Sequence, residues 1–121
     1  PRRCGWFDAV VTRHAAMVNG IDELAVTNID GLDTLDAIRV CVGYRVDGQV
    51  IHHVPAEVER LAACQPIYEE FPGWKTPTTA ATRWEDLPVN CRHYLLSIAQ
   101  MTGARLTVAS VGPAREQTIL L

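Results

Sequence analysis

The carboxylate of Asp30 has the most distinctive chemistry in this sequence. Asp30 lies in the segment 27–31, Thr-Asn-Ile-Asp-Gly, directly after the apolar run Leu-Ala-Val at residues 24–26. A carboxylate accepts two parallel hydrogen bonds, and guanine presents two neighbouring donors, its ring N–H and its amino group. Adenine presents an acceptor where guanine has the ring donor, so one carboxylate oxygen would stay unpaired. Asp30 therefore suits a guanine-reading position; the alternative interpretation is that it only forms a turn.

A second candidate loop, Ser110-Val111-Gly112-Pro113, follows another apolar run at residues 106–109. Its hydroxyl and its backbone N–H groups can contact a flat ligand. Gly112 permits close approach of the backbone, and Pro113 offers an apolar face. The alternative interpretation is an ordinary exit from a strand.

Two arginines, Arg2 and Arg3, lie at the beginning of the chain. A guanidinium group can bind a phosphate or a carboxylate through two parallel hydrogen bonds, so this pair is a candidate anion site. The alternative interpretation is a solvated chain start.

The spacing of the reactive side chains predicts no catalytic residue and no metal ligand. His52 and His53 are neighbours on a predicted strand, where adjacent side chains point to opposite faces, so they cannot share a metal ion. His14 and His93 lie on predicted helices without a partnering carboxylate. The four cysteines, at positions 4, 41, 64 and 91, form no C-x-x-C pair, and we interpret them as reduced structural thiols of a cytoplasmic protein. The sequence also lacks the phosphate-loop, dinucleotide-loop and zinc-protease motifs.

Two helices are predicted from apolar spacing. The first covers residues 6–19, with Gly20 in the position of a C-terminal helix cap. Its predicted buried stripe is Phe7, Val10, Val11, His14 and Val18. The second covers residues 87–102, begins at the capping residue Asp86 and ends at Gly103. Its predicted stripe is Leu87, Cys91, Tyr94, Leu95 and Ile98.

The remaining elements are short. Strands are predicted at residues 24–26, 39–46, 49–54, 106–109 and 118–121, a short helix at 56–63 and an extended segment at 65–74. Asp47-Gly48 lies between two of these strands and is a strong hairpin signal. The pattern predicts an α/β fold with a mixed sheet, flanking helices and one antiparallel hairpin. Ligands of such sheets bind outside the carboxyl ends of the strands, where both candidate loops fall.

Length and composition exclude several classes of protein. The chain has 121 residues, which predicts one domain over residues 1–121 without an internal boundary. It is 48% hydrophobic and 21% charged, too apolar for a disordered chain. The net charge of −3 offers no general attraction to nucleic acid. No apolar run is long enough to span a membrane. The chain starts with Pro1 instead of methionine, and we interpret it as a piece of a larger protein.

Short motifs along the whole chain resemble, in the same order, the C-terminal part of adenylosuccinate synthetases. Residues 2–8 resemble the segment after that family's arginine-rich substrate loop, and residues 24–30 resemble its strand ending in T-K-L-D. Residues 41–44 are similar to C-V-A-Y, and residues 66–74 to P-I-Y-E-x-x-P-G-W. Residues 110–120 are similar to S-x-G-P-x-R-x-x-T-I.

The resemblance implies a function as well as a fold. It implies the C-terminal segment of a larger P-loop-like fold, in a cytoplasmic, homodimeric ligase. That ligase joins IMP and L-aspartate to form adenylosuccinate, uses GTP, and binds neither nucleic acid nor membrane. Its Mg²⁺ ligands and general base would lie outside this chain, which alone would be inactive. The implied GTP-binding residues are Arg2, Asn28, Ile29, Asp30, Ser110, Val111 and Gly112, and Arg2 would also contact the aspartate substrate.

The sequence departs from the family pattern at three positions of the first loop. Asn28 stands where the family usually has Lys, which removes a cation near the nucleotide. Gly31 and Thr34 replace the family's Val and Gly. The change at Asn28 favours one alternative, a stand-alone or degenerate guanine-nucleotide-binding module without catalysis. A third interpretation is a purely structural or interaction domain.

Overall fold

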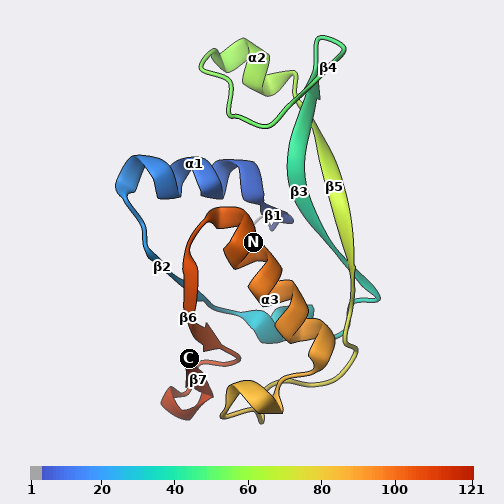
Figure 1. The fold of residues 1–121 in the computed structure, drawn as a ribbon. Coiled ribbons are helices and arrows are strands. Elements are labelled where there is room, and N and C mark those ends of the chain that lie inside the picture. Colours follow the sequence, from blue (N-terminus) through green and yellow to red (C-terminus); the bar gives the residue numbers. More distant parts are fainter. Residues whose placement is uncertain (1–3) are drawn as a thin grey trace.

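Two separate β-sheets organise residues 4–121, the part of the chain that this computed structural model describes (Figure 1). The candidate residue Arg2 lies outside the described residues. The first sheet contains β1 (Phe7–Asp8), β3 (Ala37–Val46), β4 (Gln49–Ile51) and β5 (Gln65–Pro72). The second contains β2 (Glu23–Val26), β6 (Arg105–Ser110) and β7 (Thr118–Leu120).

The long strand β3 is the centre of the first sheet. β5 runs antiparallel along it from the pair Ala37–Pro72 to the pair Arg45–Gln65. The other edge of β3 therefore holds β1, which is parallel, and β4, which is antiparallel. The predicted hairpin is confirmed: Asp47 and Gly48 have φ of +52° and +71°, as a type I′ turn requires. β4 ends at Ile51, three residues earlier than predicted.

The second sheet is also mixed. β2 and β6 are parallel, with Val26 opposite Ala109, and β7 pairs antiparallel with β6. The predicted α/β class with mixed strand pairing is therefore confirmed, but the strands are divided between two sheets. The second sheet forms because β2 and β7 take the two edges of β6, and none of these three strands pairs with a strand of the first sheet.

Helix α1 (Ala9–Asn19) begins three residues later than predicted. Its N-cap is Asp8, whose carboxylate accepts hydrogen bonds from the N–H groups of Val10 and Val11. Its C-cap is the predicted Gly20, at φ +64°. The predicted buried stripe is wrong at Val11, His14 and Val18, which are all exposed, Val11 by 46% and Val18 by 68%. The buried residues of α1 are Ala9, Val10 and Ala16.

Helix α3 (Val89–Thr102) contributes many residues to the main core, which also includes residues of both sheets. The predicted stripe is confirmed, because Leu87 and the four helical residues Cys91, Tyr94, Leu95 and Ile98 are all buried. The predicted cap is wrong. Asp86 instead ends the 3₁₀ turn Trp84–Asp86 and accepts hydrogen bonds from the backbone of Thr82 and Arg83. Pro88 is the N-cap.

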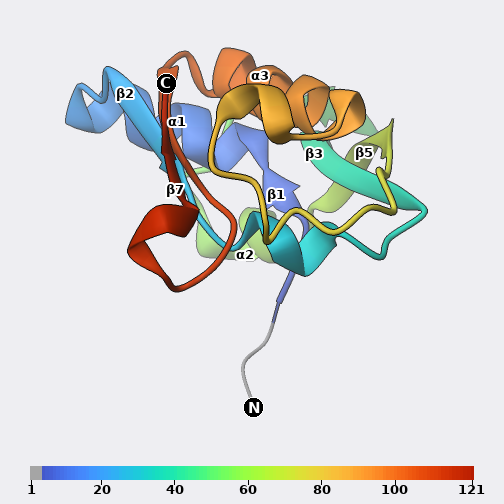
Figure 2. The same cartoon turned by 90° about the horizontal axis from the view of Figure 1, so that it is seen from below.

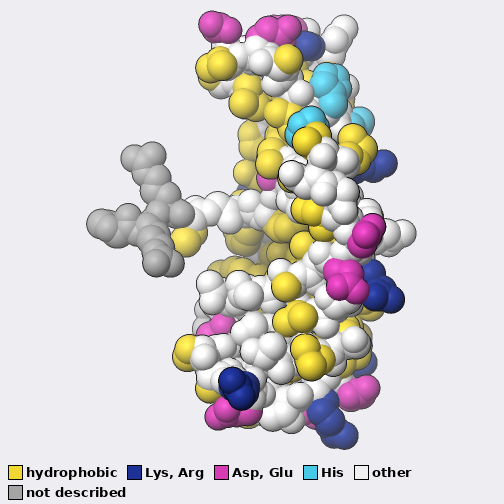
Figure 3. Space-filling view, turned by 90° about the vertical axis from the view of Figure 1, so that its left-hand side faces the viewer, with side chains coloured by type: hydrophobic (Ala, Val, Ile, Leu, Met, Phe, Trp, Pro, Cys, Tyr) yellow, Lys and Arg dark blue, Asp and Glu magenta, His cyan; other side chains and the backbone are white. Residues whose placement is uncertain are grey.

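A second, smaller core lies toward the far end of the hairpin, near the short helix α2 (Val58–Ala62). Its buried residues are Val10, Cys41, Tyr44, Val46 and Ile51. Figure 1 shows that α2 and β4 project beyond the other elements, and Figure 2 shows α3 and α1 on the same side of the molecule. The face drawn in Figure 3 presents apolar side chains among polar ones. Within residues 4–121, no helix has the length and apolarity that crossing a membrane requires.

Candidate nucleotide site

The first candidate loop is a tight turn that follows β2. Asn28 adopts the left-handed conformation, φ +58° and ψ +34°, which asparagine tolerates better than most residues. The 3₁₀ turn Ile29–Leu32 follows. The side chain of Ile29 is 1% exposed and belongs to the main core, so only its backbone can face a ligand. This anchor fixes the turn, and Asp30 is left partly exposed beside it.

The second candidate loop is held by its own polar groups. The Ser110 hydroxyl donates to the carbonyl oxygen of Gly112 at 3.0 Å. The Val111 N–H donates to the carbonyl oxygen of Gln117 at 2.9 Å, and the Val111 side chain is fully buried. A Cβ on Gly112 would lie 2.3 Å from the Gln117 side chain. A larger residue there would therefore require the Gln117 side chain to move.

The parallel pairing of β2 and β6 brings both loops to one edge. Val26 and Ala109, the last paired residues, lie opposite each other, and each loop follows directly. The carboxyl ends of parallel strands share an edge, so the two loops leave the second sheet at the same edge.

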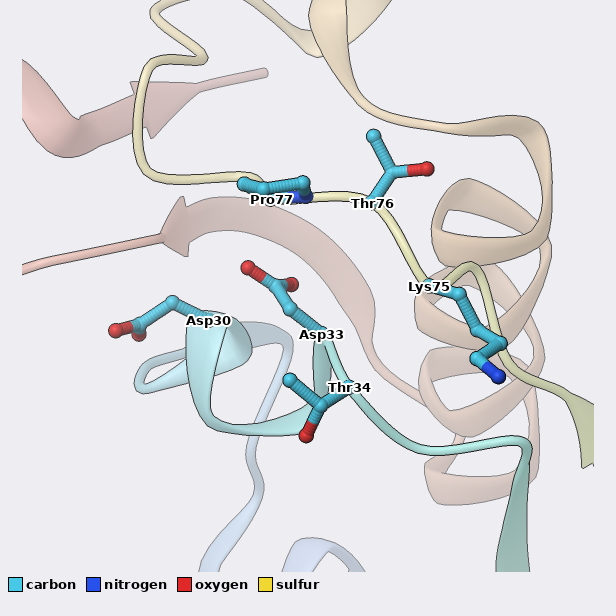
Figure 4. A pocket seen from close by; sticks show the side chains of 6 residues that line it. All are labelled: Asp30, Asp33, Thr34, Lys75, Thr76 and Pro77. Carbon is cyan, nitrogen blue, oxygen red and sulfur yellow. The ribbon is translucent and has the colours of Figure 1, made fainter.

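A cavity of about 470 Å³ opens beside Asp30. Its lining consists of Asp30, Asp33, Thr34, Lys75, Thr76 and Pro77. Figure 4 shows the two carboxylates on the turn after β2, with Thr76 and Pro77 on the segment that faces them. This volume is within the usual range for small-molecule sites, about 300–1,000 Å³.

Lys75 does not replace the cation that Asn28 lacks. Its ammonium group forms an ion pair with Asp36, 2.6 Å from Nζ to Oδ1, and it points away from Asp30 in Figure 4. The hydrogen bond with Asp36 raises the pKa of Lys75, and the same contact lowers the pKa of Asp36. Both groups therefore stay charged at neutral pH and satisfy each other.

Asp33 is a site residue that sequence reasoning missed. It is 9% exposed, and its carboxylate accepts hydrogen bonds from Trp74 and Thr78, on the segment that faces the turn. These partners are 41 and 45 residues away along the chain. No local pattern relates them, so no signal in the sequence would have found the contact.

Comparison with known proteins agrees with the motif resemblance. The family model described as adenylosuccinate synthetase matches residues 1–119. The chain belongs to the adenylosuccinate synthetase family. Two curated synthetases illustrate the match. That of Desulforamulus reducens is 49% identical over 121 residues, and that of Carboxydothermus hydrogenoformans is 50% identical over 121 residues. The chain spans 28% of the length of each.

The fold of a synthetase segment is also matched by a solved structure. A fully ligated adenylosuccinate synthetase from Plasmodium falciparum aligns with the whole of this chain and 30% of its own, with a TM-score of 0.93 and 31% identity. The α/β fold with mixed sheets is therefore the fold of this part of the family. The roles of individual residues in the two loops stay predictions.

Proposed function

We propose that this chain supplies the guanine-binding part of an adenylosuccinate synthetase, a ligase that joins IMP and L-aspartate with GTP. The observation that carries the proposal is the position of Asp30. Its carboxylate lines a cavity of about 470 Å³ beside the carboxyl edge of β2 and β6. Membership of the synthetase family supports a nucleotide as the ligand of this cavity.

The two loops complement a guanine base. The oxygens of Asp30 accept the ring N–H and the amino group. Within residues 4–121, the Gly112 N–H makes no backbone–backbone hydrogen bond, and we infer that it donates to an acceptor such as the guanine carbonyl oxygen. The loop of Asp30 then accepts hydrogen bonds from the donors of the base, and the loop of Gly112 donates one to its acceptor. Adenine does not present this arrangement of donors and acceptor. Asn28, Ile29, Ser110 and Val111 form the rest of the proposed contact surface, the buried Ile29 and Val111 through their backbone only.

The phosphoryl-transfer chemistry belongs to another part of the proposed synthetase. The resemblance implies that GTP phosphorylates the 6-oxygen of IMP, after which the aspartate amine displaces phosphate. Among residues 4–121, no three His, Cys, Asp or Glu side chains gather as a metal site, so these residues do not fit a Mg²⁺ centre. We propose that the Mg²⁺ ligands and the general base lie elsewhere in the protein, and that Arg2 contacts GTP and the aspartate substrate.

Base selectivity tests the proposal. Inosine triphosphate lacks the amino group of guanine, so it would form only one of the two hydrogen bonds to Asp30. We expect kcat/KM for inosine triphosphate to be about ten- to a hundredfold below that for GTP in the full-length synthetase, because a hydrogen bond to a charged group contributes roughly 1.5–3 kcal/mol. Steady-state kinetics with both nucleotides measures this ratio. Equal kcat/KM for the two nucleotides would contradict a hydrogen bond between Asp30 and the amino group of guanine.

The 121-residue chain alone is expected to form no adenylosuccinate from IMP, GTP and aspartate. The reason is that phosphoryl transfer requires positioned metal and phosphate-binding groups, which the described residues do not supply. A coupled or chromatographic assay of the purified chain measures product directly, with the full-length protein as the positive control. Product formed by the chain alone would overturn this part of the proposal.

The order of the motifs also leads us to propose that the chain is the C-terminal segment of a cytoplasmic, homodimeric synthetase. Sequencing the gene on both sides of these codons tests the position. An open reading frame that continues upstream supports it, whereas continuation only downstream would overturn it. A start codon directly before Pro1 would favour the alternative, a guanine-nucleotide-binding module without catalysis.

A further inference from the structure

We propose that Asp33 is a positioning residue for base recognition, an inference that rests on the proposed guanine site. Its carboxylate ties residues 74–78 to the turn that carries Asp30, and so holds the two walls of the cavity at a fixed separation. We call the three residues Asp33, Trp74 and Thr78 the Asp33 clamp.

The hydrogen bonds of the Asp33 clamp are numerous and buried. Oδ1 accepts from the indole N–H of Trp74 at 2.7 Å and from the Thr78 hydroxyl at 2.9 Å. Oδ2 accepts from the Thr78 N–H at 2.8 Å and lies 3.0 Å from the same hydroxyl. Trp74 is 7% and Thr78 is 1% exposed. Water cannot readily replace partners that are so buried, so loss of one leaves a polar group unsatisfied.

The Asp33 clamp is coupled directly to Asp30. The Asp33 N–H donates to the carbonyl oxygen of Asp30 at 3.2 Å, within the same 3₁₀ turn. A shift of the Asp33 backbone that follows loss of its side-chain contacts would therefore also reach the backbone of Asp30. Ile29 anchors the other end of the turn in the core, so the turn is held from both sides.

The facing wall depends on the same contacts. Thr76 and Pro77 line the cavity opposite the turn and belong to no helix or strand. In the sequence they lie between Trp74 and Thr78, the two clamp residues of this segment, and Figure 4 shows Thr76 and Pro77 across from Asp33. Asp33 thus binds the segment on either side of the residues that border the cavity. Loss of the Asp33 carboxylate would remove the hydrogen bonds that hold this wall beside the turn at Trp74 and Thr78.

The substitution Thr78→Val in the full-length synthetase tests the clamp with little change of shape. Valine fills the same volume but removes the hydroxyl donor, while the Thr78 N–H can still bind Asp33. We expect KM for GTP to rise about three- to tenfold, kcat at saturating GTP to change less than about twofold, and KM for IMP and aspartate to stay unchanged. The preference for GTP over inosine triphosphate should fall. Thr78→Ser restores the hydroxyl and is expected to behave as the unsubstituted enzyme.

Asp33→Asn is the stronger variant, because its amide N–H₂ would face either the Thr78 N–H or the Trp74 N–H. We expect a larger rise in KM for GTP than with Thr78→Val. Asp86→Asn is the matched control: Asp86 also accepts backbone hydrogen bonds, from Thr82 and Arg83, but it does not line the cavity. This control should leave KM for GTP unchanged. If the Asp33→Asn protein fails to fold, the kinetics of Thr78→Val alone test the proposed role of the Asp33 clamp.

An unchanged KM for GTP in Thr78→Val would overturn the proposed role of the Asp33 clamp. So would a parallel rise of KM for GTP, IMP and aspartate together with a lower melting temperature, because a purely structural role would produce that result. Failure of the guanine site is a separate result. Asp30→Asn would then leave KM for GTP unchanged, whatever Thr78→Val does. A raised KM in Asp30→Asn with an unchanged KM in Thr78→Val keeps the guanine site and rejects the clamp.

Discussion

Asp30→Asn in the full-length synthetase is expected to raise KM for GTP about ten- to a hundredfold. The substitution replaces one acceptor oxygen by an N–H₂ donor, which would face a donor of guanine. One hydrogen bond to a charged acceptor is lost, which is worth roughly 1.5–3 kcal/mol, and a contact between two donors is added. Steady-state kinetics with GTP varied at saturating IMP and aspartate measures the change.

Two internal controls accompany this result. KM for IMP and aspartate should stay nearly unchanged, because Asp30 would contact only the base of GTP. Xanthosine triphosphate carries an oxygen where guanine has its amino group, so an Asn N–H₂ can donate to it. The variant is therefore expected to use xanthosine triphosphate relatively better than the unsubstituted enzyme does. If GTP is used equally well by both proteins, Asp30 is only a turn residue.

Gly73→Ala is expected to destabilise the fold by roughly 1–3 kcal/mol or more, the range for overpacked sites. A Cβ at this position would lie 1.9 Å from the carbonyl oxygen of Leu35 and 2.9 Å from its carbonyl carbon. Both are backbone atoms, so no side chain can rotate away. The Gly73 N–H also donates to the carbonyl oxygen of Asp36 at 2.9 Å, which keeps the two backbones close. Urea denaturation of the full-length protein, followed by fluorescence, measures the loss.

Gly31→Ala is the matched control for Gly73→Ala. Gly31 lies in the 3₁₀ turn after β2, and a Cβ there would meet no atom within 4 Å. The free energy of unfolding of the Gly31→Ala protein should differ from that of the unsubstituted protein by less than about 0.5 kcal/mol. A Gly73→Ala protein as stable as this control would show that the backbone at Leu35 moves without strain. Because Gly73 precedes Trp74, the destabilised variant should also bind GTP more weakly.

Local patterns in the sequence were sufficient for several elements. The buried stripe of α3 and the glycine that ends it follow from residues three or four apart on one helix. The hairpin between β3 and β4 follows from Asp47-Gly48, whose positive φ angles are a property of the two residues themselves. The two candidate loops could be placed at one edge because each follows an apolar strand. The helix and hairpin predictions succeeded because the interacting residues are close in sequence, whereas the shared edge of the two loops also needed the pairing of β2 with β6.

Other features were decided only by tertiary contacts. Asp86 looked like a helix cap, but its carboxylate binds the backbone of the preceding loop instead. The apolar spacing of α1 did not identify its buried face, because Val11 and Val18 have no packing partner within residues 4–121 that buries them.

The candidate site shows most clearly what the sequence determines and what the tertiary structure decides. The residue type of Asp30 and its place after a strand were sufficient to propose a base-reading carboxylate. Asp33, only three residues later, has the same side chain and a different role, since the fold brings Trp74 and Thr78 to it and buries all three. The sequence determines which groups a carboxylate can bind, whereas the tertiary structure decides which donors reach it and whether water can compete.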